Sequence, residues 1–310
     1  MDQLKPQLKS RILILPLLLY FLISYVSQLA LGVIVIQGEI KDYLSKSEVY
    51  QSAIESIEEN ATYSEISTTV EELLNEEGMK ELLEKSILLI SKYAIYSVVF
   101  TALVCIPVFL SMMKSDKIKY QIFIQEEEKT VRASFLKHLY IPIGAIALHI
   151  ALNNIFTLGN LSIINEVYQK TSADMSVSKF LVQLVGLGIL VPVSEELLFR
   201  GVVYRRLKFF MKLSMAMLCS ALAFAWFQSS AVQGIYAFIS TIVFTWLYEE
   251  YKTMWAPIIA HVCMSVISII LTQYDLFLWI FEEPMRMGMI TVLSAFIASS
   301  SYVLIKNTSK

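Results

Sequence analysis

The feature that most constrains this chain is a series of apolar runs, each long enough to cross a lipid bilayer. A bilayer core about 30 Å thick needs roughly 20 mostly apolar residues per helix. The composition agrees, because 56% of the 310 residues are hydrophobic and 17% are charged, and a soluble domain cannot bury that much apolar surface. We therefore predict an all-α, polytopic membrane protein with about eight spans, at residues 12–36, 89–113, 136–159, 179–199, 212–230, 232–248, 254–273 and 287–305.

The first apolar run is interpreted as a retained membrane span. It covers Ile12 to Ile36 and follows three basic residues, which gives it the outline of a secretory signal. The apolar region of a signal peptide is only about 7–15 residues long, and this run is longer. We therefore expect it to remain part of the membrane body.

The three cysteines argue against a disulfide framework. Cys105, Cys219 and Cys263 all lie inside apolar runs and show no pairing pattern. An odd, dispersed set of this kind also argues against a cysteine-based metal site. We expect them to be small apolar residues of the core.

A strongly acidic stretch separates the first two spans. Between Gln37 and Lys85 there are 13 acidic residues and 4 lysines, a net charge of 4 − 13 = −9. Leu73, Leu74, Leu82 and Leu83 recur near helical spacing, as do Ile54 and Ile57, which is typical of amphipathic helices. We predict that residues 37–88 form one or two such helices outside the membrane, on the extracytoplasmic side. The alternatives are a solvated acidic segment without a ligand and a segment that gates the protein or recruits a partner.

The basic residues predict the orientation of the chain. Lysine and arginine gather at both ends and in alternate loops. Cytoplasmic loops carry an excess of these residues, so an even number of spans places both termini in the cytoplasm. We predict five regions along the chain: an N-terminal tail with the first span (1–36), the acidic segment (37–88), the second and third spans with their loops (89–178), a core carrying the polar motifs (179–273), and the last span with the C-terminal tail (274–310).

Two adjacent carboxylates lie at the end of the fourth predicted span. A charged side chain in hydrocarbon costs at least about 2.5–3.5 kcal/mol, so such residues usually mark a functional site. Glu196 and Arg200 are four residues apart and can pair on one helical face. Glu195 is rotated from Glu196 by about 100° and is available as a general base. The alternative is an ion pair that only anchors helices.

Other predicted spans carry polar residues at helical spacing. His261 and Ser265 are four residues apart in the seventh span and share a face. A histidine there can donate to an oxyanion, transfer protons or bind a metal, and it can also serve packing alone. Gln228 follows Phe224 by four residues, and interfacial packing is its simpler interpretation. Pro192 bends the fourth helix, which suits a cavity beside the carboxylates or is a simple kink.

Together these residues resemble the CPBP family of intramembrane proteases, which includes the CaaX prenyl endoprotease and bacterial Abi-type relatives. The first family motif, Glu-Glu-x-x-x-Arg, matches Glu195 to Arg200 in full. The second, Phe-x-x-x-His, is similar to Phe224–Gln228, with glutamine in place of histidine. The third, His-x-x-x-Asn with Asp or Ser variants, is similar to His261–Ser265. The resemblance covers residues 179–270 and implies an integral protein of a bacterial plasma membrane.

The resemblance also implies a chemistry. The activity would be hydrolysis of a peptide bond in a membrane-associated peptide or protein by an activated water. Glu195 would be the base, and Glu196 with Arg200 would support it. His261 and Ser265 would stabilise the oxyanion.

Position 228 departs from the family pattern. Glutamine cannot accept and pass on a proton at neutral pH and is a poor ligand for transition metals, although it can orient a water. Because general acid–base help contributes about 10²–10⁴-fold, Gln228 in place of the motif histidine predicts a slow enzyme or an inactive one. His149, in the third predicted span, is a candidate substitute, but the spacing does not show it.

Depth leaves a second question open at position 228. If Arg200 lies near the inner surface, Glu195 is only about 7 Å above it, whereas the fifth helix climbs about 22 Å from Leu213 to Gln228. Either the fifth helix starts deeper or tilts strongly, or Gln228 lies outside the site.

Three functions are compatible with these residues. The first is an intramembrane endopeptidase, and the second is a pseudoprotease that acts as a membrane binding, immunity or regulatory protein. The third is a transporter that uses the intramembrane charges, for which the sequence shows no repeated halves. The expected partners are the lipid bilayer and a membrane-associated substrate, not nucleic acid, and the oligomeric state is not defined. No cofactor is certain, although Glu195, Glu196 and His261 could supply ligands to a divalent metal such as zinc.

Overall fold

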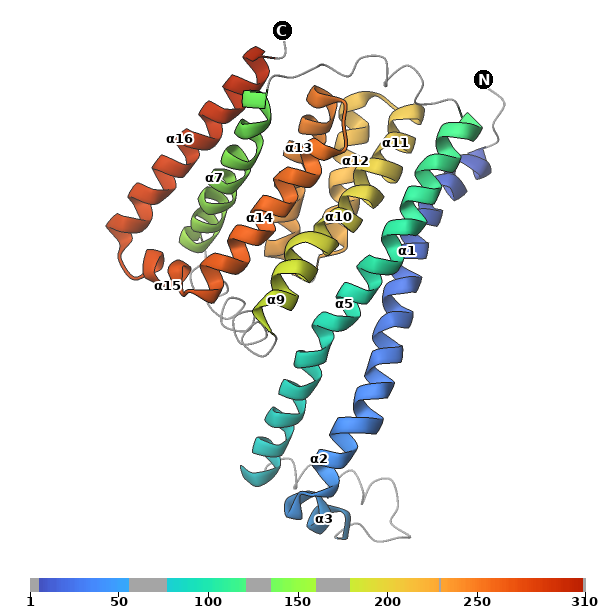
Figure 1. The fold of residues 1–310 in the computed structure, drawn as a ribbon, viewed down its shortest axis with the longest axis vertical. Helices are drawn as coiled ribbons and strands as arrows, with labels where there is room; N and C mark the ends of the chain where they lie inside the picture. The colour runs from blue at the N-terminus through green and yellow to red at the C-terminus, as the bar shows by residue number, and fades with distance from the viewer. Residues whose placement is uncertain (1–5, 56–76, 121–134, 160–178, 229, 309–310) are drawn as a thin grey trace.

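The structure is a computed structural model that describes residues 6–55, 77–120, 135–159, 179–228 and 230–308 (Figure 1). Every regular element of these described residues is a helix, as the apolar runs predict. The elements are α1 (Pro6–Val35), η1 (Ile36–Ile40), α2 (Lys41–Ser45), α3 (Glu48–Glu55), α5 (Glu77–Tyr120), α7 (Phe135–Gly159), α9 (Phe180–Val182), η2 (Gln183–Leu190), α10 (Val191–Glu196), η3 (Leu197–Tyr204), α11 (Arg205–Phe210), α12 (Leu213–Trp226), α13 (Ala231–Tyr251), α14 (Trp255–Gln273), α15 (Leu276–Phe281) and α16 (Pro284–Thr308).

Seven helical segments among the described residues are long and apolar enough to cross a membrane. The fifth predicted span differs, because α12 has 14 residues, about 21 Å at 1.5 Å per residue, and is shorter than the hydrocarbon core. The eight predicted spans therefore correspond to seven long helices and one short one. The seven long segments are Ile14–Ser45, Tyr93–Lys117, His138–Gly159, Phe180–Phe210, Ala231–Tyr251, Trp255–Gln273 and Pro284–Asn307.

The fourth segment runs from Phe180 to Phe210 through the middle of the bundle (Figure 1). Its helix is continuous, but its hydrogen-bond pattern changes between α and π along its length. Its α10 part contacts both α5 and α14, so side chains on α10 lie between two groups of helices. We predicted that this span ends at residue 199 with Arg200 near the inner surface, and that prediction is wrong. The helix continues for ten positions beyond Arg200 to Phe210, about 15 Å, and Arg200 is 0% exposed.

Pro192 lies in the first turn of α10 and is buried. The preceding element, η2, is a π-helix, whose widened turns are common at functional sites. A proline has no backbone N–H to give to the helix, so a helix that changes its hydrogen-bond pattern just before Pro192 accommodates it. The predicted irregularity is present beside the carboxylates.

Helices α1 and α5 pack along each other and extend beyond the rest of the bundle, with α2 and α3 at the tip (Figure 1). At this tip Met79 and Leu82 are buried against Tyr43, Leu44 and Tyr50. The predicted amphipathic character is therefore present in part, with residues 77–88 of the acidic segment forming the start of α5. Leu83 and Ile54 are exposed, and Ile57, Leu73 and Leu74 lie outside the described residues.

Ion pairs join the helices at the opposite end of the molecule. Arg206 on α11 donates two hydrogen bonds to Asp116 on α5, at 2.7 and 2.9 Å, and both side chains are buried. Glu249 on α13 accepts from Lys208 and Lys252, at 2.8 and 2.5 Å. The start of α1 and the end of α16 lie at this same end (Figure 1), which agrees with an even number of membrane crossings.

Candidate active site

A three-residue ion network forms the base of the polar site. Arg200 Nη1 donates to Glu196 Oε1 at 2.8 Å, and both side chains are 0% exposed. His261 Nδ1 approaches the same Oε1 atom, also at 2.8 Å. The second Arg200 nitrogen, Nη2, donates to the Thr241 carbonyl at 3.3 Å. The pair expected from the spacing of Glu196 and Arg200 is therefore present, and it reaches α14 through His261.

Glu195 faces away from this network and lines a cavity of about 420 Å³. Its Oε2 atom is 3.7 Å from His261 Nε2. Gln228 and Ser265 line the same cavity. Glu196 and Arg200 do not line it and lie behind its wall. The two neighbouring carboxylates thus have different surroundings, as their 100° separation on the helix predicts.

The hydrogen bond to Glu196 orients the imidazole of His261. An ionised carboxylate only accepts hydrogen bonds, so the proton of this contact lies on His261 Nδ1. Phe244 stacks on the imidazole with ring centroids 5.0 Å apart, and Phe224 contacts it edge-on at 6.1 Å. The same two rings lie beside the Arg200 guanidinium, at 5.2 and 5.4 Å. His261 Nε2 is thereby held toward Glu195 and the cavity.

Gln228 reaches the cavity because the depth assumed for Arg200 was wrong. With Arg200 in the interior, Glu195 lies deeper than a helix ending at residue 199 would place it. Phe224, one turn before Gln228, packs on Phe199 with centroids 4.7 Å apart, which brings the end of α12 level with α10. The Gln228 Nε2 atom donates to the Phe224 carbonyl at 3.4 Å. Of the two alternatives left open by the sequence, the one in which Gln228 joins the cavity is correct.

The candidate metal ligands Glu195, Glu196 and His261 do meet, but as an ion network. Glu196 Oε1 is already shared by Arg200 and His261. Among the described residues no group of three or more His, Cys, Asp and Glu side chains is placed to hold a metal ion.

Sequence reasoning missed a second polar pair in this cavity. His149 on α7 and Tyr236 on α13 both line it, and His149 Nδ1 is 2.5 Å from Tyr236 Oη. A histidine in a membrane span was a visible signal, but nothing in the spacing linked α7 to α13. The contact is a product of helix packing alone.

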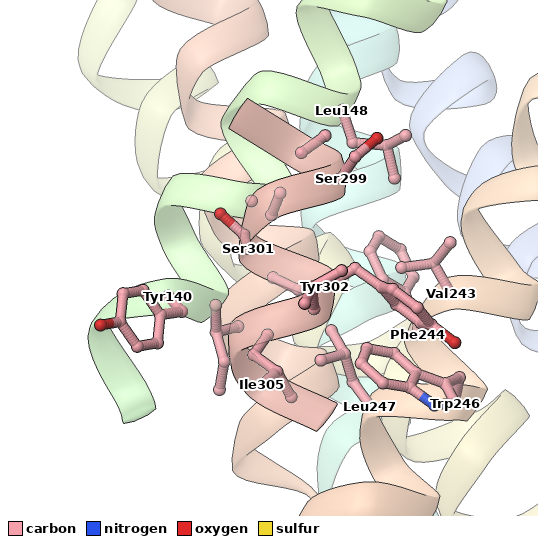
Figure 2. Close-up of a pocket in the computed structure, with 16 residues that line it drawn as sticks. Tyr140, Leu148, Val243, Phe244, Trp246, Leu247, Ser299, Ser301, Tyr302 and Ile305 are labelled. Carbon is pink, nitrogen blue, oxygen red and sulfur yellow. The ribbon is translucent and has the colours of Figure 1, made fainter. Parts of the chain in front are cut away.

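Another cavity, of about 340 Å³, lies between α7, α13, α14 and α16 (Figure 2). Phe244 lines both cavities. The lining of this one is mostly apolar, and its polar atoms come from serine, tyrosine and tryptophan side chains such as Ser299, Ser301 and Trp246. Its described lining residues include no carboxylate, lysine, arginine or histidine, whereas Glu195, His149 and His261 line the cavity beside Glu195.

Fold and site together define a polytopic, all-α membrane protein with an acidic and imidazole-containing cavity between its helices. Residues 177–267 match the family model described as "Type II CAAX prenyl endopeptidase Rce1-like". The segment that supplies Glu195, Gln228 and His261 is therefore similar to this CPBP-type family of membrane proteases. Comparisons with curated proteins and with solved structures found no match.

Proposed function

We propose that this protein is an intramembrane endopeptidase that cleaves a membrane-associated peptide or protein with a water activated by Glu195. One observation carries the proposal: Glu195, Gln228, His261 and Ser265 come from two helices, α10 and α14, and from the end of α12, and they line one cavity. The family-level match to membrane proteases agrees with it.

The distance between Glu195 and His261 supports the activation of one water. Glu195 Oε2 and His261 Nε2 are 3.7 Å apart. A water that lies about 2.8 Å from each atom has an angle of about 80° between its two contacts, which is compatible with hydrogen bonds to both. Glu195 takes a proton from this water as the oxygen attacks the carbonyl carbon. The C–N bond then breaks, and the proton passes from Glu195 to the departing amine.

His261 and Ser265 are proposed to stabilise the oxyanion. With Nδ1–H held by Glu196, a protonated His261 presents its Nε2–H to the cavity, and a donor aimed at developing negative charge lowers the barrier. Ser265 lies one turn further along α14 and lines the same space. In this scheme Glu196 and Arg200 position the imidazole and do not touch the substrate.

Gln228 supports a second candidate function, a pseudoprotease that binds a membrane partner without cutting it. Gln228 stands in the cavity, where it can orient a water but cannot relay a proton. The two candidates differ in the activity that they predict for the natural sequence: slow cleavage for the peptidase and no cleavage for the pseudoprotease.

A single assay decides between them. The purified protein in detergent is given a library of membrane-anchored reporter peptides, and release of the label is measured. We expect slow cleavage that falls about 10²–10⁴-fold in Glu195→Gln and rises in Gln228→His. Glu250→Gln, on α13 and outside the cavity, is the matched control and should leave the rate unchanged.

Cleavage that persists in Glu195→Gln would contradict the proposed mechanism. An inactive natural sequence that gains activity with Gln228→His would establish the pseudoprotease instead.

A further inference from the structure

The cavity beside Glu195 is elongated along the helix axes. On α14 its lining runs from His261 to Ile269 and passes Ser268, which lies seven residues or about 10 Å from His261. On α13 it runs from Phe244 to Gln233 and passes Tyr236, which lies eight residues or about 12 Å from Phe244. Helices α13 and α14 are consecutive and pack together, and Phe244 stacks on His261. Tyr236 and Ser268 therefore lie toward the end of the cavity remote from His261.

The side chains of His149 and Tyr236 form a polar pair in this part of the cavity. His149 Nδ1 and Tyr236 Oη are 2.5 Å apart and hydrogen-bonded, and their rings are perpendicular, with centroids 5.8 Å apart. Phe277 packs against the histidine at 6.0 Å. Three helices thus hold the His149 imidazole in one orientation, and 7% of the residue is exposed.

The other ring nitrogen of His149 is the atom that points to a ligand. His149 Nε2 is buried and has no hydrogen-bond partner among the described residues, while the side chain lines the cavity. Buried polar atoms are nearly always paired. When Tyr236 donates to Nδ1, the neutral imidazole carries its proton on Nε2 and offers a donor to an oxygen atom.

We propose that His149 and Tyr236 form a second binding station for the substrate, where His149 Nε2–H binds a peptide oxygen about three residues from the bond attacked beside Glu195. An extended chain advances about 3.3 Å per residue, so three residues span the 10–12 Å that separate the level of His261 from the level of Tyr236 and Ser268. The inference rests on the proposed function. His149 lies on α7, outside residues 177–267, so the residue that would bind the peptide oxygen comes from a part of the chain that the family model does not cover.

The test compares substrate lengths. One reporter peptide keeps three residues on each side of the cleaved bond, and a shortened one keeps a single residue. We expect His149→Phe to raise KM about tenfold for the longer reporter, with kcat unchanged, and to leave the shorter one unaffected. Free-acid and amidated ends of the longer reporter distinguish a terminal carboxylate from a main-chain carbonyl as the bound oxygen.

Two further variants keep the test decisive. His138→Phe places the same change on α7 but outside the cavity and should leave KM unchanged. Tyr236→Phe removes the hydroxyl that orients His149 and should raise KM in the same direction even if His149→Phe fails to fold. An equal loss for both reporters, or a loss in kcat alone, would overturn the station and indicate a structural role.

A binding measurement tests this inference independently of the proposed function. The affinity of the fluorescently labelled longer reporter is measured by anisotropy in the Glu195→Gln background, with and without His149→Phe. Weaker binding by about tenfold supports the station even if no peptide is ever cleaved. If His149→Phe changes neither the binding affinity nor KM, the second binding station is refuted and the peptidase proposal is unaffected.

Discussion

Glu196 determines how the polar site is arranged at the level of single residues. Its Oε1 atom lies 2.8 Å from both Arg200 Nη1 and His261 Nδ1. It therefore neutralises a fully buried guanidinium and fixes which nitrogen of His261 faces the cavity. Glu195, its neighbour in sequence, is left to the cavity. Two identical side chains have different surroundings because consecutive residues of a helix are rotated by about 100° about its axis.

The Glu196–Arg200 pair leads to a prediction about stability. Glu196→Ala and Arg200→Ala each leave one charge without its partner in the interior, so each should cost about 3–5 kcal/mol of unfolding free energy. The double change Glu196→Leu with Arg200→Met should cost less than either single change, because no buried charge remains. Thermal unfolding in detergent measures all three. If the loss of unfolding free energy in the double variant equals the sum of the losses in the two single variants, the pair is not coupled.

At the scale of elements, the helix from Phe180 to Phe210, which changes between α and π hydrogen bonding, packs against several other helices of the bundle. Its η2 part packs against α5 and α14, and its η3 part packs against α5 and α12. Small residues permit these close approaches. A Cβ atom on Gly186 would lie 2.3 Å from Val99 Cγ2 on α5, so at this point the backbone of η2 meets a stiff β-branched side chain.

Gly186→Ala is therefore expected to push η2 away from α5. Overpacking of this kind costs about 1–3 kcal/mol, and thermal unfolding in detergent should detect it. Gly288→Ala on α16 is the matched control, because no atom lies within 4 Å of its added Cβ. Combining Gly186→Ala with Val99→Ala should recover part of the loss. No loss in the single variant would mean that the two helices separate freely.

At the scale of the whole molecule, the described chain has two unlike ends. One end carries Arg206, Lys208 and Lys252, which pair with acidic residues of neighbouring helices or of their own helix, together with the start of α1 and the end of α16 (Figure 1). The other end extends into the α1–α5 hairpin with α2 and α3 at its tip. Excess lysine and arginine favour the cytoplasmic side, so we propose that the basic end is cytoplasmic.

A reporter of cytoplasmic location fused after Lys310 should therefore be active in a bacterial host. The same reporter inserted at Ser47, between α2 and α3, should be inactive, because this tip is expected on the other side. The measurement is enzyme activity of the two fusions at equal expression. The reverse pattern would invert the proposed orientation.

Much of the site was predictable because its signals are local. A four-residue spacing indicates a shared helical face, so the Glu196–Arg200 pair could be predicted and is present. The depth of Arg200 and the length of α12 were not predictable, since both depend on where neighbouring helices cover a polar side chain. The His149–Tyr236 contact joins residues 87 positions apart, and no periodicity reports such a pair.

The sequence by itself determined that the chain is a helical membrane protein, because bilayer thickness converts apolar length directly into spans. It also determined which acids share a helix with which base, since helical geometry depends only on position along the chain. Only the tertiary structure decided that Glu195, Gln228 and His261 line one cavity with His149 at its far end. The packing of helices against one another is set by side chains distant in sequence, and their meeting has no local signature.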